Sequence, residues 1–314
     1  MKDKLIIITG PTASGKSDIA INLARKINSQ ILSSDSQQVY RYMDIGTNKV
    51  DDFTVDHHLI NLINPDENFS VEEFKSEAIS IIRKLNDNGL TPIMTGGTGF
   101  YIDSILFEMN YGQVTKNQDL RDKLDSDADE FGNEYLYEKL KEIDPESAVK
   151  YHPNERNRII RALEIYKETG VKASVQRTGE RVLNNSIDPI LFFLNYENRD
   201  ILYKKINIRV ERMIDQGLIE EFKYLIERFK LTPDSQSMAA IGYKEVFPFI
   251  NGEINKDELI ETIARNTRRY AKRQITWMKR YKNYPFCHEI KMDELSKEDA
   301  GMIIESIVKD VYGL

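Results

Sequence analysis

Short apolar runs alternate along this chain with longer segments whose apolar residues recur at helical spacing. The runs are rich in β-branched residues, which is typical of strands buried on both faces of a sheet. The predicted strands are residues 5–9, 31–34, 92–95 and 189–194. Helical periodicity fills residues 17–29 and 70–88 between them. Strands that alternate with helices predict an α/β fold with a parallel sheet and right-handed crossovers.

Capping residues sharpen two of the predicted helices. Ser70 and Glu73 have the spacing of a capping box at the start of the helix over 70–88, and Gly89 follows its end. A further helix is predicted over residues 153–169, where Gly170 ends it. After Arg199 the pattern is almost entirely helical.

A helical segment without strands interrupts the alternation. The stretch from 119 to 146 is unusually acidic and holds eleven acids: Asp119, Asp122, Asp125, Asp127, Asp129, Glu130, Glu134, Glu138, Glu142, Asp144 and Glu146. We therefore predict a first core part over 1–110, a helical insertion domain over 111–187, and a return to the core with a helical C-terminal region over 188–314. The expected fold class is α/β, with a P-loop NTPase-like parallel sheet, an inserted all-helical domain and a helical C-terminal region.

Composition narrows the class of protein. The 314 residues, 40% hydrophobic and 30% charged, are typical of a soluble globular protein of about two domains. Cys287 is the one cysteine, which excludes an internal disulfide and a cysteine-based zinc site. No apolar run approaches the roughly 20 residues of a membrane span. We expect a cytoplasmic protein without a membrane partner.

Positive charge is concentrated in residues 265–282. The net charge is 44 − 51 = −7, yet residues 265–282 contain eight cations and no acid. Tyr270, Trp277 and Tyr281 interleave with these cations. Such a helix suits an RNA backbone with aromatic side chains that pack or stack on bases. The alternative is a solvated charged face with aromatic residues in the core.

A glycine-rich loop lies between the first predicted strand and the first helix. Its residues fit the pattern G-x-x-x-x-G-K-[ST]: Gly10, Pro11, Thr12, Ala13, Ser14, Gly15, Lys16 and Ser17. Backbone N–H groups of such a loop, together with the helix N-terminus, cradle phosphate groups. Lys16 adds a positive charge, and the Ser17 hydroxyl can hold Mg²⁺. The loop therefore predicts a di- or triphosphate ligand without specifying a reaction.

Further candidates follow the next two strands. Strand 92–95 lacks the terminal acid of P-loop ATPases and continues into Gly96-Gly-Thr98-Gly-Phe-Tyr101. Asp35 is instead the acid at a strand end, where parallel sheets bind ligands. It is a candidate metal-positioning acid or general base, with a turn aspartate as the alternative. Thr98 could bind the same phosphates, unless its segment is a plain turn.

Arginines elsewhere have two interpretations. Arg158 and Arg161 lie three residues apart on one helix face and could reach phosphates. They could equally pair with Glu155 and Glu164. Arg209 could close on a diphosphate, although a surface arginine is the simpler expectation.

In order along the chain, these motifs resemble the tRNA dimethylallyltransferases (tRNA isopentenyltransferases) of the bacterial type. The resemblance rests on Gly10–Ser17, Asp35-Ser-Gln-Gln-Val-Tyr40, Gly96-Gly-Thr-Gly-Phe-Tyr101, Arg158-Ile-Ile-Arg-Ala-Leu-Glu164, Ala240-Ile-Gly-Tyr-Lys-Glu245 and Thr267-Arg-Arg-Tyr-Ala-Lys-Arg-Gln-Ile-Thr-Trp277. It implies transfer of a dimethylallyl group from dimethylallyl diphosphate to N6 of the adenine that follows the tRNA anticodon. No ATP is consumed, which accounts for the missing ATPase acid.

The resemblance also assigns roles. Asp35 would accept a proton or hydrogen bond from the N6 amine, while Lys16, Thr98 and Arg209 would stabilise the departing diphosphate. Ser17 would ligate Mg²⁺. The implied tRNA-binding residues are Asp35, Ser36, Gln37, Gln38, Thr98, Arg121, Asn157, Arg158, Ile159, Ile160, Arg161, Ala239, Ala240, Ile241, Gly242, Tyr243, Lys244, Lys272, Arg273, Gln274, Trp277 and Lys279. The partners would be tRNA, through its anticodon arm, and dimethylallyl diphosphate, and the enzyme is expected to be a monomer.

Two alternatives use the same residues differently. A small-molecule P-loop kinase would use the insertion as a lid with Arg156, Arg158 and Arg161, but it has no need of the basic, aromatic-rich segment. A non-enzymatic, nucleotide-gated RNA-binding protein would use the loop and that segment, and Asp35 would have no chemical task.

Overall fold

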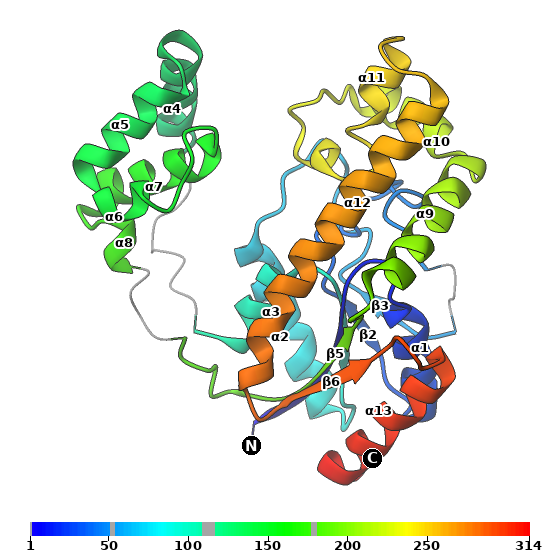
Figure 1. The fold of residues 1–314 in the computed structure, drawn as a ribbon. Coiled ribbons are helices and arrows are strands. Elements are labelled where there is room, and N and C mark those ends of the chain that lie inside the picture. Colours follow the sequence, from blue (N-terminus) through cyan, green and yellow to red (C-terminus); the bar gives the residue numbers. More distant parts are fainter. Residues whose placement is uncertain (1, 51–53, 109–116, 177–180) are drawn as a thin grey trace. The chain divides into compact units, whose positions relative to one another are not determined.

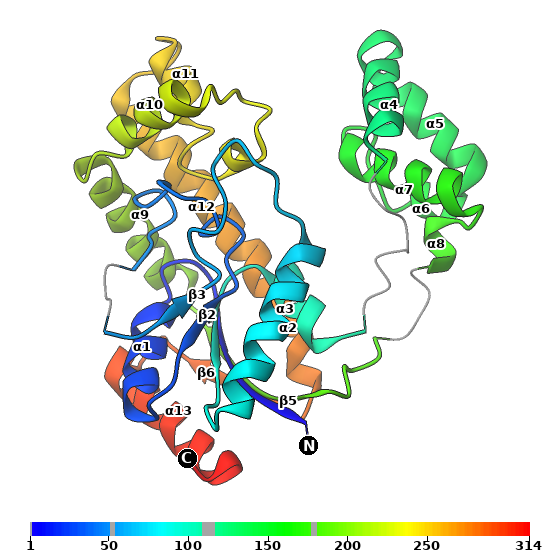
Figure 2. The same ribbon diagram turned by 180° about the vertical axis from the view of Figure 1, so that it is seen from behind.

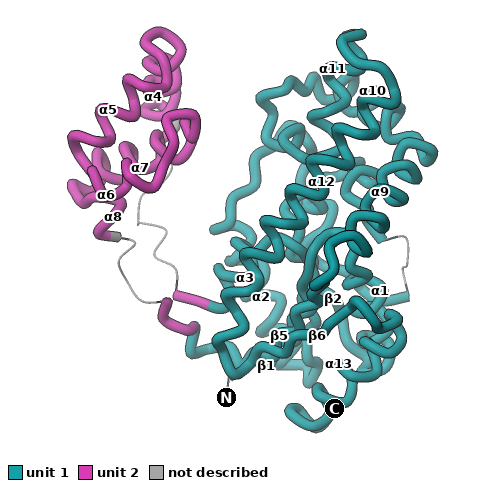
Figure 3. The backbone as a smooth tube through the Cα atoms, in the orientation of Figure 1, with its two compact units in different colours: residues 1–106, 184–314 teal, residues 107–183 magenta. Residues whose placement is uncertain are grey.

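The computed structural model describes residues 2–50, 54–108, 117–176 and 181–314. The chain divides into two compact units (Figure 3). Unit 1 comprises residues 1–106 and 184–314, and unit 2 comprises residues 107–183. Within the described segments, no helix is long and apolar enough to cross a membrane.

A parallel six-stranded sheet forms the centre of unit 1. Its order is β3-β2-β4-β1-β5-β6. The strands are β1 (Asp3–Thr9), β2 (Ile31–Ser33), β3 (His57–His58), β4 (Ile93–Gly96), β5 (Ile187–Asn195) and β6 (Cys287–Lys291). β1 lies in the interior of the sheet, and its Ile7 is in register with Met94 of β4 and Leu191 of β5. Its apolar residues are fully buried, as the continuous apolar run requires.

Helices cover both faces of this sheet (Figures 1 and 2). α1 (Lys16–Lys26) and α13 (Lys297–Tyr312) pack together on one face, and α2 (Val71–Asp87) and α3 (Gly99–Leu106) pack on the other. The remaining helical elements of unit 1 are α9 (Arg199–Asp215), α10 (Leu218–Phe229), η1 (Gln236–Ala239), α11 (Val246–Ile250), α12 (Lys256–Met278) and η2 (Lys279–Asn283). The long α12 packs against α9 and reaches α3.

Local sequence signals explain several boundaries. The capping box of α2 is confirmed, because Ser70 accepts a hydrogen bond from the backbone of Glu73 and Glu73 caps Ser70 in return. The four predicted strands are present to within two residues at each end. Two strands were not predicted. β3 has only two residues, and β6 lies at the sheet edge with one buried residue, Ile290, so neither shows a continuous apolar run.

Unit 2 is an all-helical bundle with its own core. It contains α4 (Gln118–Phe131), α5 (Asn133–Ile143), α6 (Pro145–Ala148), α7 (Arg156–Thr169) and α8 (Ala173–Gln176). Leu136, Leu140 and Ile159 are fully buried in that core. The chain enters and leaves through a paired connection, in which the Glu108 N–H donates to the Val182 carbonyl (2.8 Å). The boundaries at 107 and 183 each lie four residues before those expected from the sequence.

The last helix is tied to the first strand. The backbone N–H of Leu5 donates to the Tyr312 hydroxyl (3.4 Å), and the Lys4 ammonium donates to the Tyr312 carbonyl (3.2 Å). The hydroxyl of Tyr312 also donates to the Asp188 carbonyl of β5. Through Tyr312, α13 therefore binds both β1 and β5, which are neighbouring strands of the sheet.

Candidate active site

The phosphate loop turns sharply between β1 and α1. Ala13 (φ 63°) and Gly15 (φ 84°) both have left-handed backbone conformations, which direct successive N–H groups into the turn. Gly15 is also the N-cap of α1, so the positive end of the helix dipole points at the loop. A Cβ on Gly10 would lie 2.8 Å from the Leu194 carbonyl oxygen, so this position requires glycine. The loop has the geometry of an anion site.

Two half-buried cations from different elements contact this loop. The Lys16 ammonium donates to the Pro11 carbonyl (3.3 Å), and the Arg209 guanidinium of α9 donates to the Thr12 hydroxyl (2.7 Å). Burial lowers the pKa of Lys16 to about 8, an effect that Asp35 opposes and Arg209 reinforces. Burial also lowers the pKa of Arg209, and Asp35 again opposes the shift. Bringing an anion into this site would relieve the cost of placing two cations together.

Asp35 is located at the end of β2, as expected for a ligand site in a parallel sheet. Its Oδ1 accepts a hydrogen bond from the Gln37 N–H (2.9 Å), and its own N–H donates to the Ser33 hydroxyl (3.3 Å). The first contact orients the carboxylate, and within the described part of the chain no arginine or lysine is hydrogen-bonded to it. The neighbouring Ser36 N–H donates to the Thr98 hydroxyl (3.1 Å), which joins the loop after β2 to the turn after β4.

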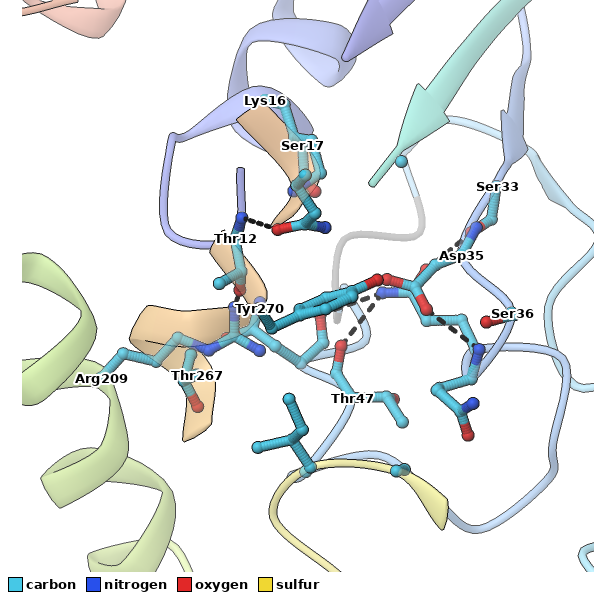
Figure 4. A pocket seen from close by; sticks show the side chains of 18 of the residues that line it. Thr12, Lys16, Ser17, Ser33, Asp35, Ser36, Thr47, Arg209, Thr267 and Tyr270 are labelled. Atoms are coloured by element: carbon cyan, nitrogen blue, oxygen red, sulfur yellow. Dashed lines mark hydrogen bonds between the residues drawn. The ribbon is translucent and has the colours of Figure 1, made fainter. Parts of the chain in front are cut away.

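One cavity of about 290 Å³ in unit 1 brings these groups together. Small-molecule sites start at roughly this size. Figure 4 shows Lys16, Ser17, Asp35, Arg209 and Tyr270 around it. The predicted site residues that line it are Thr12, Lys16, Ser17, Asp35, Ser36, Gln37, Gln38, Arg209, Ala239, Ala240, Ile241, Lys244, Arg273 and Gln274. Val210 and Met213 of α9 add an apolar wall.

Tyr270 is a site residue whose position sequence reasoning did not identify. The sequence pattern marks it only as one aromatic residue within the basic segment, but its ring projects from α12 into the cavity, toward Asp35 (Figure 4). Burial, reinforced by the charge of Asp35, raises the pKa of Tyr270. Its hydroxyl therefore stays protonated and can donate a hydrogen bond. The i, i+4 spacing to Gln274, which also faces the cavity, is the signal that could have placed it.

Glu221 of α10 holds the loop at 43–47, which forms another wall of the cavity. Its Oε2 accepts hydrogen bonds from the N–H groups of Asp44 and Ile45 (2.9 Å each). The Tyr243 hydroxyl donates to Glu221 Oε1 (2.6 Å) and accepts from the Gly46 N–H (3.2 Å). Tyr243 is fully buried by these contacts. The structure places Tyr243, which the resemblance assigns to tRNA binding, behind this wall, where its side chain supports the loop.

The other unit 1 positions expected to contact tRNA divide between surface and interior. Lys272 and Lys279 are exposed, whereas Gly242 is buried. Trp277 packs so closely on Gly99 that a Cβ there would lie 2.1 Å from the indole ring. The Arg280 guanidinium lies 3.8 Å from the Trp277 ring centroid. Trp277 therefore packs against Gly99 and Arg280 within unit 1.

Several cations of the basic segment, residues 265–282, form ion pairs with acids from elsewhere in the chain. Arg268 pairs with Glu261 (2.8 Å), Arg280 pairs with the buried Asp103 (3.2 Å), and Lys282 pairs with Glu289 (2.6 Å). The partner acids come from outside residues 265–282, so the absence of acids within the segment did not imply uncompensated charge. Arg273, in contrast, faces the cavity.

The candidate tRNA residues of unit 2 are arranged around α7. Arg158 pairs with Glu155, and Arg161 pairs with Glu164 (2.6 Å), as the alternative interpretation of these arginines expected. Arg121 also binds Glu164 (2.8 Å). Asn157 is exposed. Ile159 and Ile160, which the resemblance also assigns to tRNA binding, are 0% and 3% exposed, and their side chains pack in the core of this unit.

The donor set for a metal ion is small. Among the described residues, no group of three or more His, Cys, Asp or Glu side chains could hold a metal. The Ser17 hydroxyl borders the cavity at the phosphate loop. This arrangement fits an ion such as Mg²⁺, which commonly takes most of its ligands from phosphate oxygens and water.

A family model and full-length relatives both match this chain over most of its length. A family model described as IPP transferase matches residues 38–281. A tRNA dimethylallyltransferase of Alkaliphilus oremlandii is 43% identical over 319 residues, covering 100% of this chain and 98% of that protein. Another, from Caldanaerobacter subterraneus subsp. tengcongensis, is 45% identical over 285 residues, covering 90% of each.

Solved structures give the same result. The chain is similar to the tRNA isopentenylpyrophosphate transferase of Bacillus halodurans, with a TM-score of 0.71, 38% identity, and coverage of 98% of this chain and 96% of that one. It is also similar to a eukaryotic dimethylallyltransferase acting on tRNA, with a TM-score of 0.81 and 29% identity, covering 98% of this chain and 78% of that one.

Proposed function

Because this chain belongs to the IPP transferase family of tRNA dimethylallyltransferases, we propose that its cavity transfers a dimethylallyl group from dimethylallyl diphosphate to N6 of the adenine 3′ of the tRNA anticodon. The chain is thus a transferase, and family membership favours this reaction over the kinase alternative. The observation that carries the proposal is the cavity itself, in which Asp35 faces Lys16 and Arg209.

The cations and loop amides serve the leaving group. As the allylic C–O bond breaks, negative charge develops on the diphosphate, and preorganised donors stabilise it without rearrangement. Lys16, Arg209 and the N–H groups of residues 13–17 supply these donors. Mg²⁺, held through Ser17 and the diphosphate, would neutralise part of the same charge. Val210 and Met213 offer an apolar wall to the five-carbon group.

Asp35 serves the nucleophile. The N6 amine attacks the allylic carbon, a C–N bond forms as the C–O bond breaks, and one N6 proton passes to Asp35 and then to solvent. An aromatic amine is a weak nucleophile, so orientation and proton acceptance both contribute. Ser36, Gln37 and Gln38 lie beside Asp35 on the cavity wall and would contact the base. The base must leave its stack to reach them.

Surface residues of both units would bind the tRNA. In unit 1 we assign this role to the exposed Lys272 and Lys279 and to Arg273, with Ala239, Ala240, Ile241 and Lys244 at the cavity. In unit 2 the assignment rests on Arg121, Asn157, Arg158 and Arg161. The three arginine side chains are partly exposed, so they could contact phosphates while keeping their acid partners. The anticodon arm is the part of the tRNA that carries the target base.

The test combines labelled dimethylallyl diphosphate, Mg²⁺ and unmodified tRNA with the wild-type protein or Asp35→Ala. We expect label in tRNA without ATP, and a loss of turnover of roughly 10²–10⁴-fold in Asp35→Ala with unchanged tRNA affinity. A parallel reaction contains ATP labelled at the γ-phosphate. Phosphate release or transfer from ATP without prenyl transfer would overturn the proposal in favour of a kinase, and tight tRNA binding without product would favour a binding protein.

A further inference from the structure

Gln274 of α12 bridges the two loops that form the diphosphate side of the cavity. Its Oε1 accepts a hydrogen bond from the Thr12 N–H (2.9 Å), and its Nε2 donates to the Gly97 carbonyl (3.0 Å). The side chain is only 5% exposed. Thr12 belongs to the phosphate loop after β1, whereas Gly97 belongs to the turn after β4. The amide therefore satisfies one donor and one acceptor from loops that are far apart in sequence.

The contact is sterically tight on both sides. A Cβ on Gly97 would lie 2.1 Å from Gln274 Nε2, so the turn can approach the amide only because this residue is glycine. On the other side, the Thr12 hydroxyl accepts from Arg209, so Thr12 is held by α12 and α9 together. Its N–H is occupied by Gln274 and is not free to bind a phosphate.

α12 connects this bridge to the outer surface. Tyr270, Gln274 and Trp277 recur at i, i+4 and i+7, so they share the helix face that packs on the cavity and on Gly99. Lys272 and Lys279 lie on the exposed part of the same chain segment. α12 thus carries the Gln274 amide inside and Lys272 outside, and Lys279 lies outside at the start of η2.

We propose that Gln274 is a positioning residue for the transfer reaction, which fixes the phosphate loop against the turn that carries Thr98. This inference rests on the proposed function, and it replaces the expectation that the Gln274 side chain binds tRNA. Gln274 acts through Thr12 and Gly97: without either hydrogen bond, the loop amides and Thr98 lose their common alignment on the diphosphate. The expected effect is therefore on the lipid diphosphate, not on tRNA.

The first variant is Gln274→Met, which keeps the length of the side chain and removes both hydrogen bonds. It leaves the half-buried Thr12 N–H and the buried Gly97 carbonyl without this partner, so we expect the KM for dimethylallyl diphosphate and the Kd for inorganic pyrophosphate to rise roughly 10- to 100-fold. The tRNA Kd, measured by filter binding, should stay within about twofold of wild type. Thermal unfolding verifies that the variant is folded.

Gln236→Met is the matched control. The Gln236 amide also bridges a backbone N–H and a carbonyl, both of Phe69 (3.1 and 3.0 Å), but it does so outside the cavity. Removing it eliminates the same two kinds of hydrogen bond. We expect the pyrophosphate Kd and the kinetic constants of this variant to stay within about twofold of wild type.

Gln274→Glu adds a signature that a merely structural role would not produce. An ionised carboxylate still accepts from Thr12 but places negative charge against the Gly97 carbonyl and near the diphosphate. A protonated carboxyl can donate to Gly97 as the amide does. We expect the ratio of Gln274→Glu to wild-type kcat/KM to rise as the pH falls, whereas the ratio for Gln274→Met stays flat.

Two results would overturn the inference. One is wild-type pyrophosphate affinity in folded Gln274→Met, and the other is an effect confined to tRNA binding. The pyrophosphate measurement needs no transfer reaction. If the wild-type protein prenylates no tRNA, the proposed function fails, and the pyrophosphate Kd of Gln274→Met still decides whether Gln274 positions the phosphate loop.

Discussion

Lys16 shows how a single residue can make the site sensitive to pH. Its ammonium lines the same cavity as the Arg209 guanidinium, and desolvation lowers its pKa to about 8. The charged form, which attracts a diphosphate, is therefore fully populated only below about pH 7. Asp35 supports that form from across the cavity, so each of these charged groups depends on the others.

Pyrophosphate binding should weaken as the pH rises through 8. Below that pKa Lys16 is protonated in both free and bound protein, so its protonation adds no pH dependence. Above it, binding requires proton uptake, and the Kd should rise by up to about tenfold per pH unit. Calorimetry at several pH values measures this dependence. In Lys16→Arg, which stays charged, the dependence should be shallower, and an equally steep dependence in both proteins would contradict the assignment to Lys16.

At the scale of elements, hydrogen bonds between distant segments place the functional groups. Glu164 of α7 joins three parts of unit 2. Its side chain is fully buried and accepts hydrogen bonds from Arg121, from Arg161 and from the backbone of Asn117. Burial alone would raise the pKa of Glu164, but these contacts outweigh it and lower the pKa. The carboxylate is therefore ionised in the folded unit.

Glu164→Ala should destabilise unit 2 by about 3 kcal/mol, because it leaves two arginines without their buried partner. Since the folded pKa is lowered, the stabilisation from ionised Glu164 is present above the unfolded pKa, near 4.5, and disappears as the pH falls through the folded value. Urea unfolding at pH 7 and below pH 4 measures both effects. The difference between variant and wild type should shrink at the lower pH, and a constant difference would contradict this account.

Two exposed lysines, Lys272 of α12 and Lys279 of η2, lead to a separate prediction about tRNA binding. Replacing the exposed Lys272 and Lys279 by alanine should weaken tRNA binding and reduce its salt dependence, by roughly 0.7–0.9 in logarithmic slope for each phosphate that is no longer neutralised. Pyrophosphate affinity should not change. Lys84→Ala on α2 provides a control that removes a cation from another helix. Equal salt dependence of tRNA binding in the wild type, the Lys272/Lys279 double variant and Lys84→Ala would exclude Lys272 and Lys279 as phosphate contacts.

Local patterns predicted the elements better than the contacts between them. The apolar runs and the Ser70 capping box are local signals, so the main strands and α2 followed from sequence. β3 and β6 depend on pairing with β2 and β5, which no local pattern reports. In the site, the loop motif and strand-end position identified Lys16 and Asp35. The internal role of Gln274 and the burial of Tyr243 and Ile159 emerged only from tertiary packing.

On the scale of the whole molecule, unit 2 is inserted at one point of unit 1. The Asn184 N–H donates to the Leu106 carbonyl (2.9 Å), so the two ends of the insertion are already adjacent in unit 1. The cavity is lined entirely by residues of unit 1. Among the described residues, those that we propose for the diphosphate site therefore all belong to unit 1.

A variant in which a short glycine-containing turn replaces residues 107–183 should fold and bind pyrophosphate within about twofold of the full chain. Its tRNA affinity should fall, because the candidate residues of unit 2 are absent. Circular dichroism, calorimetry and filter binding test these three statements. Unchanged tRNA affinity would remove unit 2 from the RNA-binding surface, and failure of a folded variant to bind pyrophosphate would contradict the independence of unit 1.

The interior position of β1 has a consequence for synthesis on the ribosome. β1 is made before its neighbours β4 and β5, which begin at Ile93 and Ile187, and before α13, whose Tyr312 binds Leu5. Unit 2 has its own core within residues 107–183, so it can fold while the C-terminal part of unit 1 is still being translated. The nascent chain must therefore carry an apolar strand that lacks both neighbouring strands until β4 has been made, and one of them until β5 has been made at residue 195. A chaperone that shields apolar segments would protect β1 during that period.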